Sequence, residues 1–399
     1  MLFSAVIGLA EIKTKLRNLV EKNRLGHALL LSAPEGAGGL PMALAFSQFL
    51  VCERVAEAKP MDGFPVESCG NCPPCVKAAK MIHPDIHYSY PVVPKTSREK
   101  PISTDYISDW RQFISLYPYG SIFDWLQYIQ QGEDSKVNPE DYKPGKKQGN
   151  ITANECNDIN RKLSLKSFES GYKILVMWMP EYLGNEGNKL LKLIEEPPAD
   201  TLFILVTENE ADILPTIISR LQIIRLPRPS LPEIQEALIK RGGIESNLAR
   251  QLAAVSEQNF REALKQLEQG HDDWLSLLRE WLNAILKTGP VAQVKWVEEI
   301  GKVGREKQKQ FLQYFIHLLE QAIRTRMSDG ILADVPDSEK DFALRLNKIA
   351  NMEAQQAIVQ ELNKSVYYIE RNAHAKLLFH ALTIRFYHIL AAGEEAVVR

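Results

Sequence analysis

The sequence predicts an α/β P-loop domain with a parallel sheet, followed by a small helical domain and an all-α C-terminal domain. Up to about residue 226, apolar runs alternate with helical segments, which is the rhythm of a parallel sheet covered by helices. In "LLLSAPEGAGGLPMALAFSQFL", residues 29–50, an apolar run, a glycine-rich turn and a helical stretch follow one another, as in a phosphate-binding loop. After "RLPRPSLPEI", whose prolines mark a turn or linker, the remaining pattern is helical.

Five apolar runs are predicted to be the strands of this sheet. They are "HALLLSA", "IHYSYPV", "YKILVMWM", "TLFILVTE" and the shorter "LQIIRL". These runs are apolar almost continuously, as strands buried on both faces must be. We therefore place the α/β domain at residues 1–226.

Residues 96–149 differ from their surroundings and are predicted to be an insertion in the α/β domain. Polar runs, "KTSREK" and "QQGEDSKVNPEDYKPGKKQGN", flank an aromatic-rich patch. The polar runs favour a surface loop or disorder. The aromatic patch favours a local core over a partner surface. Its aromatic residues are Trp110, Phe113, Tyr117, Tyr119, Phe123 and Trp125.

The helical remainder is predicted to consist of two domains. Residues 227–270 contain three short helical patterns, the first two separated by Gly242 and Gly243, and form a small lid domain. In residues 271–399 the helical patterns lengthen, with apolar residues at i, i+3, i+4 and i+7 over residues 273–288, 306–327 and 352–392. This pattern predicts a C-terminal bundle suited to helix association and oligomerisation.

The composition fits a multidomain globular protein. The chain has 399 residues, 45% hydrophobic and 25% charged, with a formal net charge of -2. The length predicts about two to four domains, and the charge gives no global signal for nucleic acid. Any DNA contact is then local or shared with partners. The start, "MLFSAVIGLAEIKTKL", has no signal-peptide pattern, and no long uncharged apolar run occurs, so we expect a cytoplasmic protein without membrane contact.

The glycine-rich turn keeps the shape of a phosphate-binding loop but lacks its charged and hydroxyl groups. The pattern G-x-x-x-x-G-K-[ST] supplies a Lys for the phosphates and a hydroxyl for magnesium. Aligned on Gly38, the chain has Ala33 at the first glycine, Gly39 at the Lys and Leu40 at the hydroxyl position. We interpret Gly36, Gly38 and Gly39 as residues kept for backbone geometry.

Four of the five cysteines predict a structural Zn²⁺ site. Cys52, Cys69, Cys72 and Cys75 have the spacing C-x16-C-x2-C-x2-C, and "CGNCPPC" supplies turns. Thiolates at this spacing can converge on one tetrahedral ion, and four of them leave no position for a reactive water. His83 in "MIHPDIHY" is the nearest competing ligand, and we interpret it as a turn residue before Pro84.

Taken in order, the motifs resemble those of the delta-prime subunits of bacterial DNA polymerase III clamp loaders. The glycine-rich loop, the cysteine module, "HPD", "LLKLIEEPP" and "PTIISRLQ" follow one another here. That family belongs to the AAA+ proteins, with the gamma/tau subunits and the eukaryotic replication factor C subunits. The resemblance covers residues 4–95 and 150–268, with no match in the insertion or the C-terminal helices.

The resemblance implies that the chain does not hydrolyse ATP. In "KILVMWMPEYLG" the positions of the two acidic residues that bind magnesium and polarise water are Trp178 and Met179, and Glu181 is the only acid nearby. Phosphoryl transfer depends on positioning and charge, so two matched losses predict no turnover. Binding of ATP is doubtful, although weak binding by the loop amides remains an alternative.

Two arginines receive roles from the same resemblance. Ser219, Arg220 and Leu221 stand at the "SRC" signature, which makes Arg220 the candidate arginine finger for a neighbouring subunit. The alternative for Arg220 is an ordinary surface ion pair. In "NFREALKQLEQ", Arg261 stands at the sensor 2 position, where a nucleotide-sensing role and structural pairing both remain open.

The implied function is that of a clamp-loader subunit which helps load the sliding clamp onto primed DNA during replication. The implied partners are gamma/tau and delta subunits, the clamp, and DNA reached through the assembly, in the cytoplasm near the nucleoid. DNA-directed DNA polymerase activity would belong to the whole complex. Two alternatives remain: an active gamma/tau-like AAA+ ATPase with a divergent P-loop, and a zinc-dependent scaffold that binds DNA directly.

Overall fold

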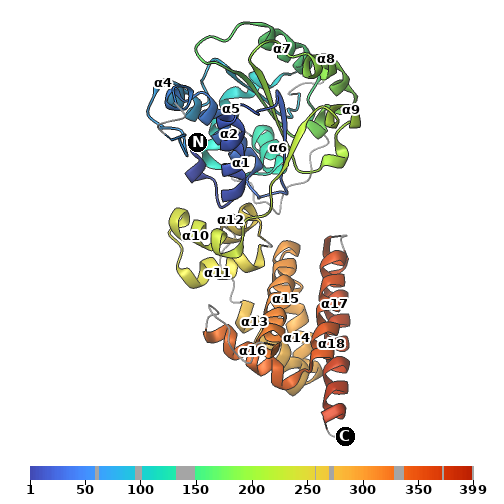
Figure 1. Ribbon diagram of the computed structural model, residues 1–399. Coiled ribbons are helices and arrows are strands. Elements are labelled where there is room, and N and C mark those ends of the chain that lie inside the picture. The colour runs from blue at the N-terminus through green and yellow to red at the C-terminus, as the bar shows by residue number, and fades with distance from the viewer. Residues whose placement is uncertain are drawn as a thin grey trace. The chain divides into compact units, whose positions relative to one another are not determined.

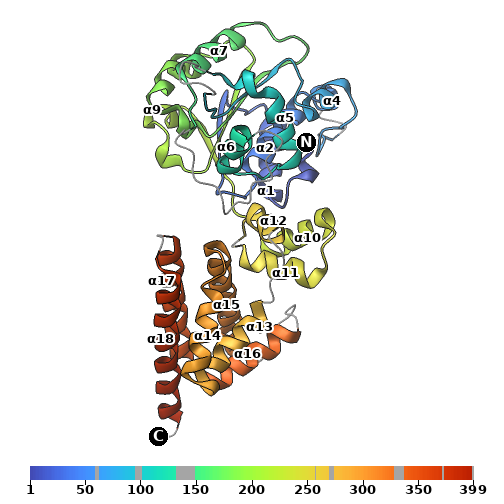
Figure 2. The same cartoon turned by 180° about the vertical axis from the view of Figure 1, so that it is seen from behind.

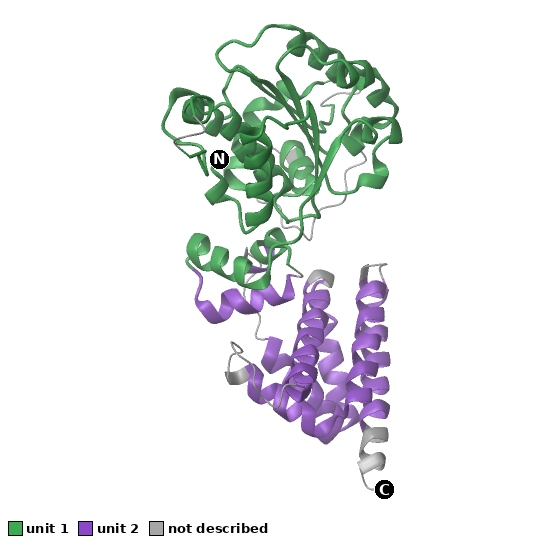
Figure 3. Ribbon diagram, viewed as in Figure 1, with its two compact units in different colours: residues 1–243, 258–264 green, residues 244–257, 265–399 purple. Residues whose placement is uncertain are grey.

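A computed structural model of the chain has two compact units, shown in Figure 3. Residues 1–243 and 258–264 form unit 1, and residues 244–257 and 265–399 form unit 2. The structure describes residues 1–58, 63–94, 101–131, 149–256, 258–268, 274–327, 337–370 and 373–397. Most of the second polar run of the insertion, for which a loop is predicted, lies outside these residues.

Unit 1 is built on a parallel five-stranded sheet with the strand order β2-β3-β4-β1-β5. All five predicted strands are confirmed. β1 lies between β4 and β5, and Ser32 pairs with Thr207 and Arg225 at the carboxyl ends. The glycine-rich turn, which follows β1, therefore leaves the sheet beside the ends of β4 and β5. The strands are β1 (Ala28–Ser32), β2 (Ile86–Ser89), β3 (Lys173–Trp178), β4 (Thr201–Thr207) and β5 (Gln222–Arg225).

Helices cover both faces of the sheet, as Figures 1 and 2 show from opposite sides. Alternate strand residues serve two cores: Leu29 and Leu31 face one, and Leu30 faces the other. The first face carries η1 (Phe3–Ala5), α1 (Ala10–Glu21), α2 (Gly39–Leu50), α3 (Glu53–Ala56) and α4 (Pro73–Ala79). The second carries α7 (Ala153–Ser164), η5 (Pro180–Leu190), α8 (Leu191–Glu195) and α9 (Pro215–Ile218), and η6 (Glu210–Asp212) follows β4.

The described part of the insertion packs on the same face as α2. It forms η3 (Ser103–Tyr106), α5 (Ile107–Leu116) and α6 (Ile122–Gln131). Trp110 and Trp125 are fully buried, and the Trp110 ring stacks on Tyr90 at 4.0 Å between centroids. Trp110 also contacts Trp178 at the end of β3, at 5.4 Å. The aromatic patch is therefore local core, with Phe123 exposed.

The three short helices predicted after the sheet are confirmed as α10 (Leu231–Gly242), α11 (Ser246–Val255) and α12 (Phe260–Glu268). Ser230 and Glu233 cap the start of α10, and Gly243 ends it with a φ of 62°. α10 and the first residues of α12 belong to unit 1, and α11 belongs to unit 2.

Unit 2 is entirely helical in its described residues and is built around a core in which Trp281 stacks on Trp296 at 4.6 Å. Two of its helices, α14 and α16, have no counterpart among the predicted segments. The single predicted segment at 352–392 is two helices, with Ala373 and His374 outside both. The elements are α13 (Trp274–Asn283), η7 (Ala284–Thr288), α14 (Pro290–Ile300), α15 (Arg305–Met327), α16 (Asp337–Ile349), α17 (Met352–Glu370) and α18 (Ala375–Val397). Among the helices described, none is long and apolar enough to span a bilayer.

Candidate nucleotide site, surface arginine and metal cluster

The glycine-rich turn between β1 and α2 has the backbone of a phosphate cradle but no room for a side chain at Gly39. Gly36 and Gly38 have φ values of 72° and 90°, a region that favours glycine. A Cβ on Gly39 would lie 2.8 Å from the Ala33 Cβ and 3.0 Å from a Val206 methyl carbon. The position that a Lys occupies in an active loop is thus closed by packing.

The space above the cradle is filled by the chain itself. The remaining cavity measures about 30 Å³, which is room for about one water, whereas pockets for small ligands are about 300 Å³ or more. Trp178, at the place of a metal-binding acid, is buried and lines this cavity. The other lining residues come from the turn, from the start of α2, from β4 and the residue after it, and from the loop between α5 and α6: Ala33, Pro34, Gly36, Gly38, Gly39, Leu40, Pro41, Pro118, Tyr119, Gly120, Val206 and Glu208.

Two carboxyl groups, those of Glu208 and Glu181, lie beside the cradle. Glu181 Oε1 accepts hydrogen bonds from the backbone N–H groups of Glu208 at 2.9 Å and Asn209 at 3.2 Å, and from the Thr207 hydroxyl. Glu181 therefore holds the loop after β4. Burial, with the nearby charges of Glu35, Glu181 and Asp124, raises the pKa of Glu208 to about 8. Glu208 therefore keeps its proton at neutral pH, and it offers a phosphate no positive charge.

Arg261 is buried at the start of α12 and pairs with the insertion. Its Nε and Nη2 donate to the two carboxylate oxygens of Asp124 at 2.9 and 3.2 Å. The side chains of Arg261 and Asp124 are 8% and 10% exposed. The guanidinium also lies over the Tyr117 ring, 5.1 Å from its centroid. The geometry is that of a two-pronged, charge-assisted pair.

Arg220 lies at the surface, in the turn between α9 and β5. Its Nε donates to Glu195 Oε1 at 2.6 Å, and Nη1 donates to the Thr216 carbonyl. The two charged side chains are 33% and 44% exposed. Ion pairs this exposed contribute about 0–1 kcal/mol, so the arginine can leave Glu195 at little cost.

The four predicted metal ligands converge. Their Sγ atoms all lie within 4.8 Å of one another. Cys52 and Cys72 precede α3 and α4, Cys75 lies within α4, and Cys69 is followed by Gly70 with a φ of 74°. Backbone N–H groups of Cys72 and Asn71 lower the pKa of Cys69 to about 6, and burial raises the pKa values of Cys72 and Cys75. A cation is needed to hold all four as thiolates.

His83, the competing ligand, and Cys156, the fifth cysteine, both lie outside this cluster. His83 Nδ1 accepts from the Asp85 N–H at 3.1 Å, and burial lowers the pKa of His83, as suits a turn residue. The fifth cysteine, Cys156, is buried in α7 with Sγ 3.7 Å from the Glu186 carbonyl oxygen. Burial raises the pKa of Cys156 to about 11, so it is an unreactive thiol.

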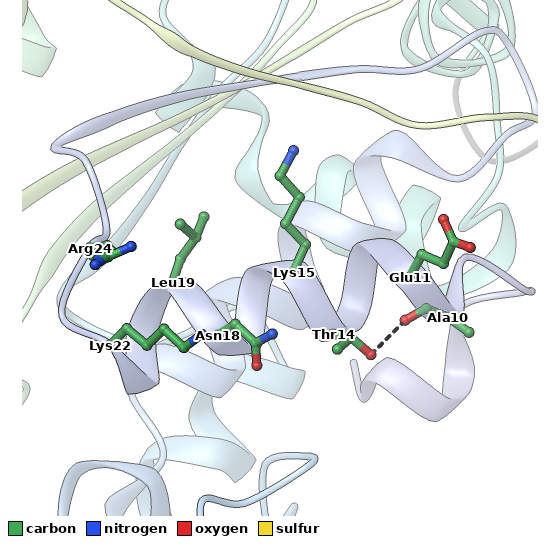
Figure 4. A pocket seen from close by; sticks show the side chains of 8 residues that line it. All are labelled: Ala10, Glu11, Thr14, Lys15, Asn18, Leu19, Lys22 and Arg24. Atoms are coloured by element: carbon green, nitrogen blue, oxygen red, sulfur yellow. Dashed lines mark hydrogen bonds between the residues drawn. The ribbon is translucent and has the colours of Figure 1, made fainter.

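A second hollow, of about 540 Å³, runs along α1 and is drawn in Figure 4. The exposed charged groups along it are Lys15, Lys22, Arg24 and Glu11. Thr14, which also lines it, donates its hydroxyl to the Ala10 carbonyl at 2.9 Å. The side chains point from one helix and the turn after it, and they form an open, mostly basic face.

Comparison with known proteins gives the family. A profile described as "DNA polymerase III, delta subunit" matches residues 8–230. The chain belongs to this family. Delta' of Bacillus subtilis is 27% identical over 252 residues, which are 63% of this chain and 56% of that protein. Delta' of Pseudomonas aeruginosa is 27% identical over 195 residues, 49% of this chain and 41% of that protein. The resemblance stated from the motifs is confirmed.

Other relatives are subunits of the same polymerase. The tau subunit of Bacillus subtilis is 24% identical over 314 residues, 76% of this chain and 43% of that protein. The chain spans about half the length of the curated relatives it matches. Among solved structures, a gamma subunit-related protein of Thermotoga maritima has a TM-score of 0.36 at 15% identity, covering 94% of this chain and 98% of that chain.

Proposed function

We propose that the chain is a clamp-loader subunit of a DNA polymerase III assembly that does not turn over ATP itself and lends Arg220 to a neighbouring subunit. The observation that carries the proposal is the contrast between two sites. The cradle holds about 30 Å³ of free space, whereas Arg220 lies in a half-exposed ion pair at the surface. The family membership supports the role in polymerase III.

The cradle does not support hydrolysis, for three separate reasons. Packing around Gly39 excludes a long side chain, Trp178 stands where the resemblance places a metal-binding acid, and Glu208, which also lines the cavity, supplies no positive charge. Hydrolysis needs a cation on the phosphates and a held water. We therefore expect neither ATP binding nor turnover by the isolated chain.

Arg220 has the properties that a group working on a neighbour requires. An arginine supplied by a second protein neutralises charge that develops on the transferred phosphoryl group, with rate gains of about 10³ to 10⁵. Arg220 is near the surface, and its partner Glu195 is itself exposed. On docking, we propose, the guanidinium leaves Glu195 for the phosphates of the neighbour's ATP.

The rest of the proposal concerns domains and partners. We propose an α/β domain at 1–226, a lid at 227–270 and an oligomerisation domain at 271–399. The C-terminal helices would join the chain to gamma/tau and delta subunits, and the assembly would act on the sliding clamp and primed DNA in the cytoplasm.

The proposed Zn²⁺ would be held by Cys52, Cys69, Cys72 and Cys75, whose Sγ atoms lie within 4.8 Å of one another. Four soft thiolates in this arrangement suit tetrahedral zinc. The bound ion would tie the end of α2 to α3 and α4 and would have no catalytic role. Elemental analysis tests this: we expect one zinc per chain and loss of it in Cys72→Ser, with Cys156→Ser as the matched control. An unchanged metal ratio in Cys72→Ser would remove the site.

The test of the arginine is ATP hydrolysis by the reconstituted assembly with Arg220→Ala. We expect a fall of about 10³-fold or more at the neighbouring site, because transition-state charge is no longer neutralised. Arg225→Ala is the matched control, because Arg225 is also a surface arginine, paired with Glu210. Equal rates for the two variants would refute the assignment.

The alternative of an active ATPase is tested with the isolated chain. Steady hydrolysis that disappears in Glu181→Gln would establish it and would contradict the proposal. Binding of primed DNA by the isolated chain, measured at low and moderate salt, tests direct DNA recognition. We expect weak binding, because the chain carries a net charge of -2.

A further inference from the structure

The loop between α5 and α6 enters the phosphate cradle. Tyr119 is 4% exposed, and its ring carbon Cε1 lies 3.0 Å from the position that a Cβ on Gly38 would take. The Tyr119 hydroxyl accepts the Ile7 backbone N–H at 2.8 Å. The ring is therefore held by its hydroxyl at Ile7 and packs against the turn at Gly38.

The same insertion supplies the carboxylate that binds Arg261. Asp124, in the first turn of α6, uses both oxygens for the guanidinium. Its Oδ2 also accepts the Ser121 N–H at 2.8 Å and the Ser121 hydroxyl at 3.0 Å. A buried carboxylate fixed by its own helix start and aimed at a buried arginine is an anion built into the fold.

Tyr119 and Asp124 together join the cradle to α10 and to the start of α12, all within unit 1. The Tyr119 ring meets Phe260 edge-on at 5.0 Å. Arg241 of α10 lies 5.8 Å from the Tyr119 and Phe260 ring centroids and donates to the Ala5 carbonyl. Asn259 packs so closely on Gly36 that a Cβ there would lie 1.9 Å from its side-chain oxygen.

We propose that residues 118–124 are an internal substitute for a bound nucleotide. Tyr119 fills the phosphate cradle, and the Asp124 carboxylate gives Arg261 the anionic partner that a phosphate would otherwise supply. The first residues of α12 are thereby held on the α/β domain without a ligand. This inference rests on one part of the proposed function, namely that the chain does not bind ATP. It does not depend on the role proposed for Arg220.

Hydrogen exchange of the full chain, read at the amides of residues 258–264, tests the proposal. In the wild-type chain we expect strong protection that millimolar MgATP leaves unchanged. Asp124→Asn and Arg261→Lys each lose one charge-assisted bond, so exchange at these amides should accelerate about tenfold. Glu210→Gln, which breaks the exposed pair with Arg225, is the matched control and should leave exchange at residues 258–264 unchanged.

Chemical rescue distinguishes the proposed nucleotide substitute from an ion pair that only stabilises the fold. In the double variant Tyr119→Ala, Asp124→Ala the cradle is opened and the anion removed, and inorganic pyrophosphate should restore most of the lost protection. Adding Arg261→Ala should abolish that rescue. If the double variant does not fold, Asp124→Ala with inorganic phosphate replaces it, because rescue by phosphate shows that Arg261 accepts a phosphate in place of the carboxylate. Lack of rescue would overturn the proposal that residues 118–124 substitute for a nucleotide, but it would leave the proposal of an inactive cradle standing. Protection of the wild-type chain that depends on MgATP would overturn both proposals.

Discussion

The phosphate cradle and the Arg220 surface differ in how firmly their charged groups are held. At the cradle, Asp124 and Arg261 are 10% and 8% exposed and share two hydrogen bonds. At the surface, Arg220 and Glu195 are 33% and 44% exposed. Removing one partner of a buried pair costs about 3–5 kcal/mol, whereas an exposed pair contributes about 0–1 kcal/mol.

This difference suggests a division of labour within one domain. The cradle is closed by packing and buried pairing, so it serves the stability of unit 1. Arg220 is loosely held, so it is available for another molecule. Under the proposed function, the chain lacks phosphate chemistry of its own and keeps Arg220 to act on a neighbour's.

The largest effect is expected when a lysine is placed at position 39, where an active phosphate-binding loop has one. Gly39→Lys should destabilise unit 1 by about 3 kcal/mol or more, because the new side chain overlaps Ala33 and Val206 and buries a charge. Chemical denaturation with an ATPase assay checks both consequences. A stable variant that gains ATP hydrolysis would show that the cradle is open.

A smaller effect is expected where the turn meets α12. Gly36→Ala places a side chain at a φ of 72° and against Asn259, so strain and displacement together should cost about 2–3 kcal/mol. Gly243→Ala is the control, because its φ is 62° but nothing lies within 4 Å. Equal losses in thermal unfolding would mean that the contact with Asn259 contributes nothing.

The acids around the cradle predict a pH dependence. Because the pKa of Glu208 is raised from 4.5 to about 8, the folded state keeps a proton that the unfolded state releases. Stability from this group is complete below pH 4.5 and declines as pH rises to about 8, by on the order of 1 kcal/mol per pH unit. Glu208→Gln should remove that slope, measured as the difference between urea titrations of variant and wild type. If the free energy of unfolding changes with pH equally in the variant and the wild type, the buried position of Glu208 is contradicted.

The smallest effect is expected at the surface. Glu195→Gln should change the free energy of unfolding by less than about 1 kcal/mol, because the pair with Arg220 is well exposed. Raised salt should reduce even that difference. A loss comparable to that of Gly36→Ala, in the same denaturation assay, would show that Arg220 is held too firmly to leave.

The sheet was predictable from the sequence because its strands are buried on both faces. Near-continuous apolar runs such as "KILVMW" and "TLFILVT" have no other stable position in a domain of this kind. The cysteine cluster was also predictable, since Cys69, Cys72 and Cys75 are separated by two residues each and Cys52 is the next nearest cysteine along the chain. The division of residues 352–392 was not, because the apolar period runs through the break without glycine or proline.

What fills the cradle could not be read from local pattern. Ala33, Gly39 and Leu40 indicate that the loop lacks the usual lysine and hydroxyl. Tyr119 and Asp124, however, reach the site from an insertion that is distant in the sequence. The only signal is "LYPYGSIFD", a turn with two tyrosines and a helix-start acid. Such a segment indicates a fixed turn, and only the tertiary fold shows what it covers. The α16 segment lacks a strong signal because charged and polar residues interrupt its few apolar ones, although Phe342, Ala343 and Leu346 are buried in the fold.

The most direct test of the account is a calorimetric titration of the full chain with MgATP. A cradle filled by Tyr119 and bordered by Glu208 predicts heats no larger than those of dilution at every ATP concentration. A saturable heat with a stoichiometry near one nucleotide per chain would contradict the closed cradle and, with it, the division of labour between the two sites.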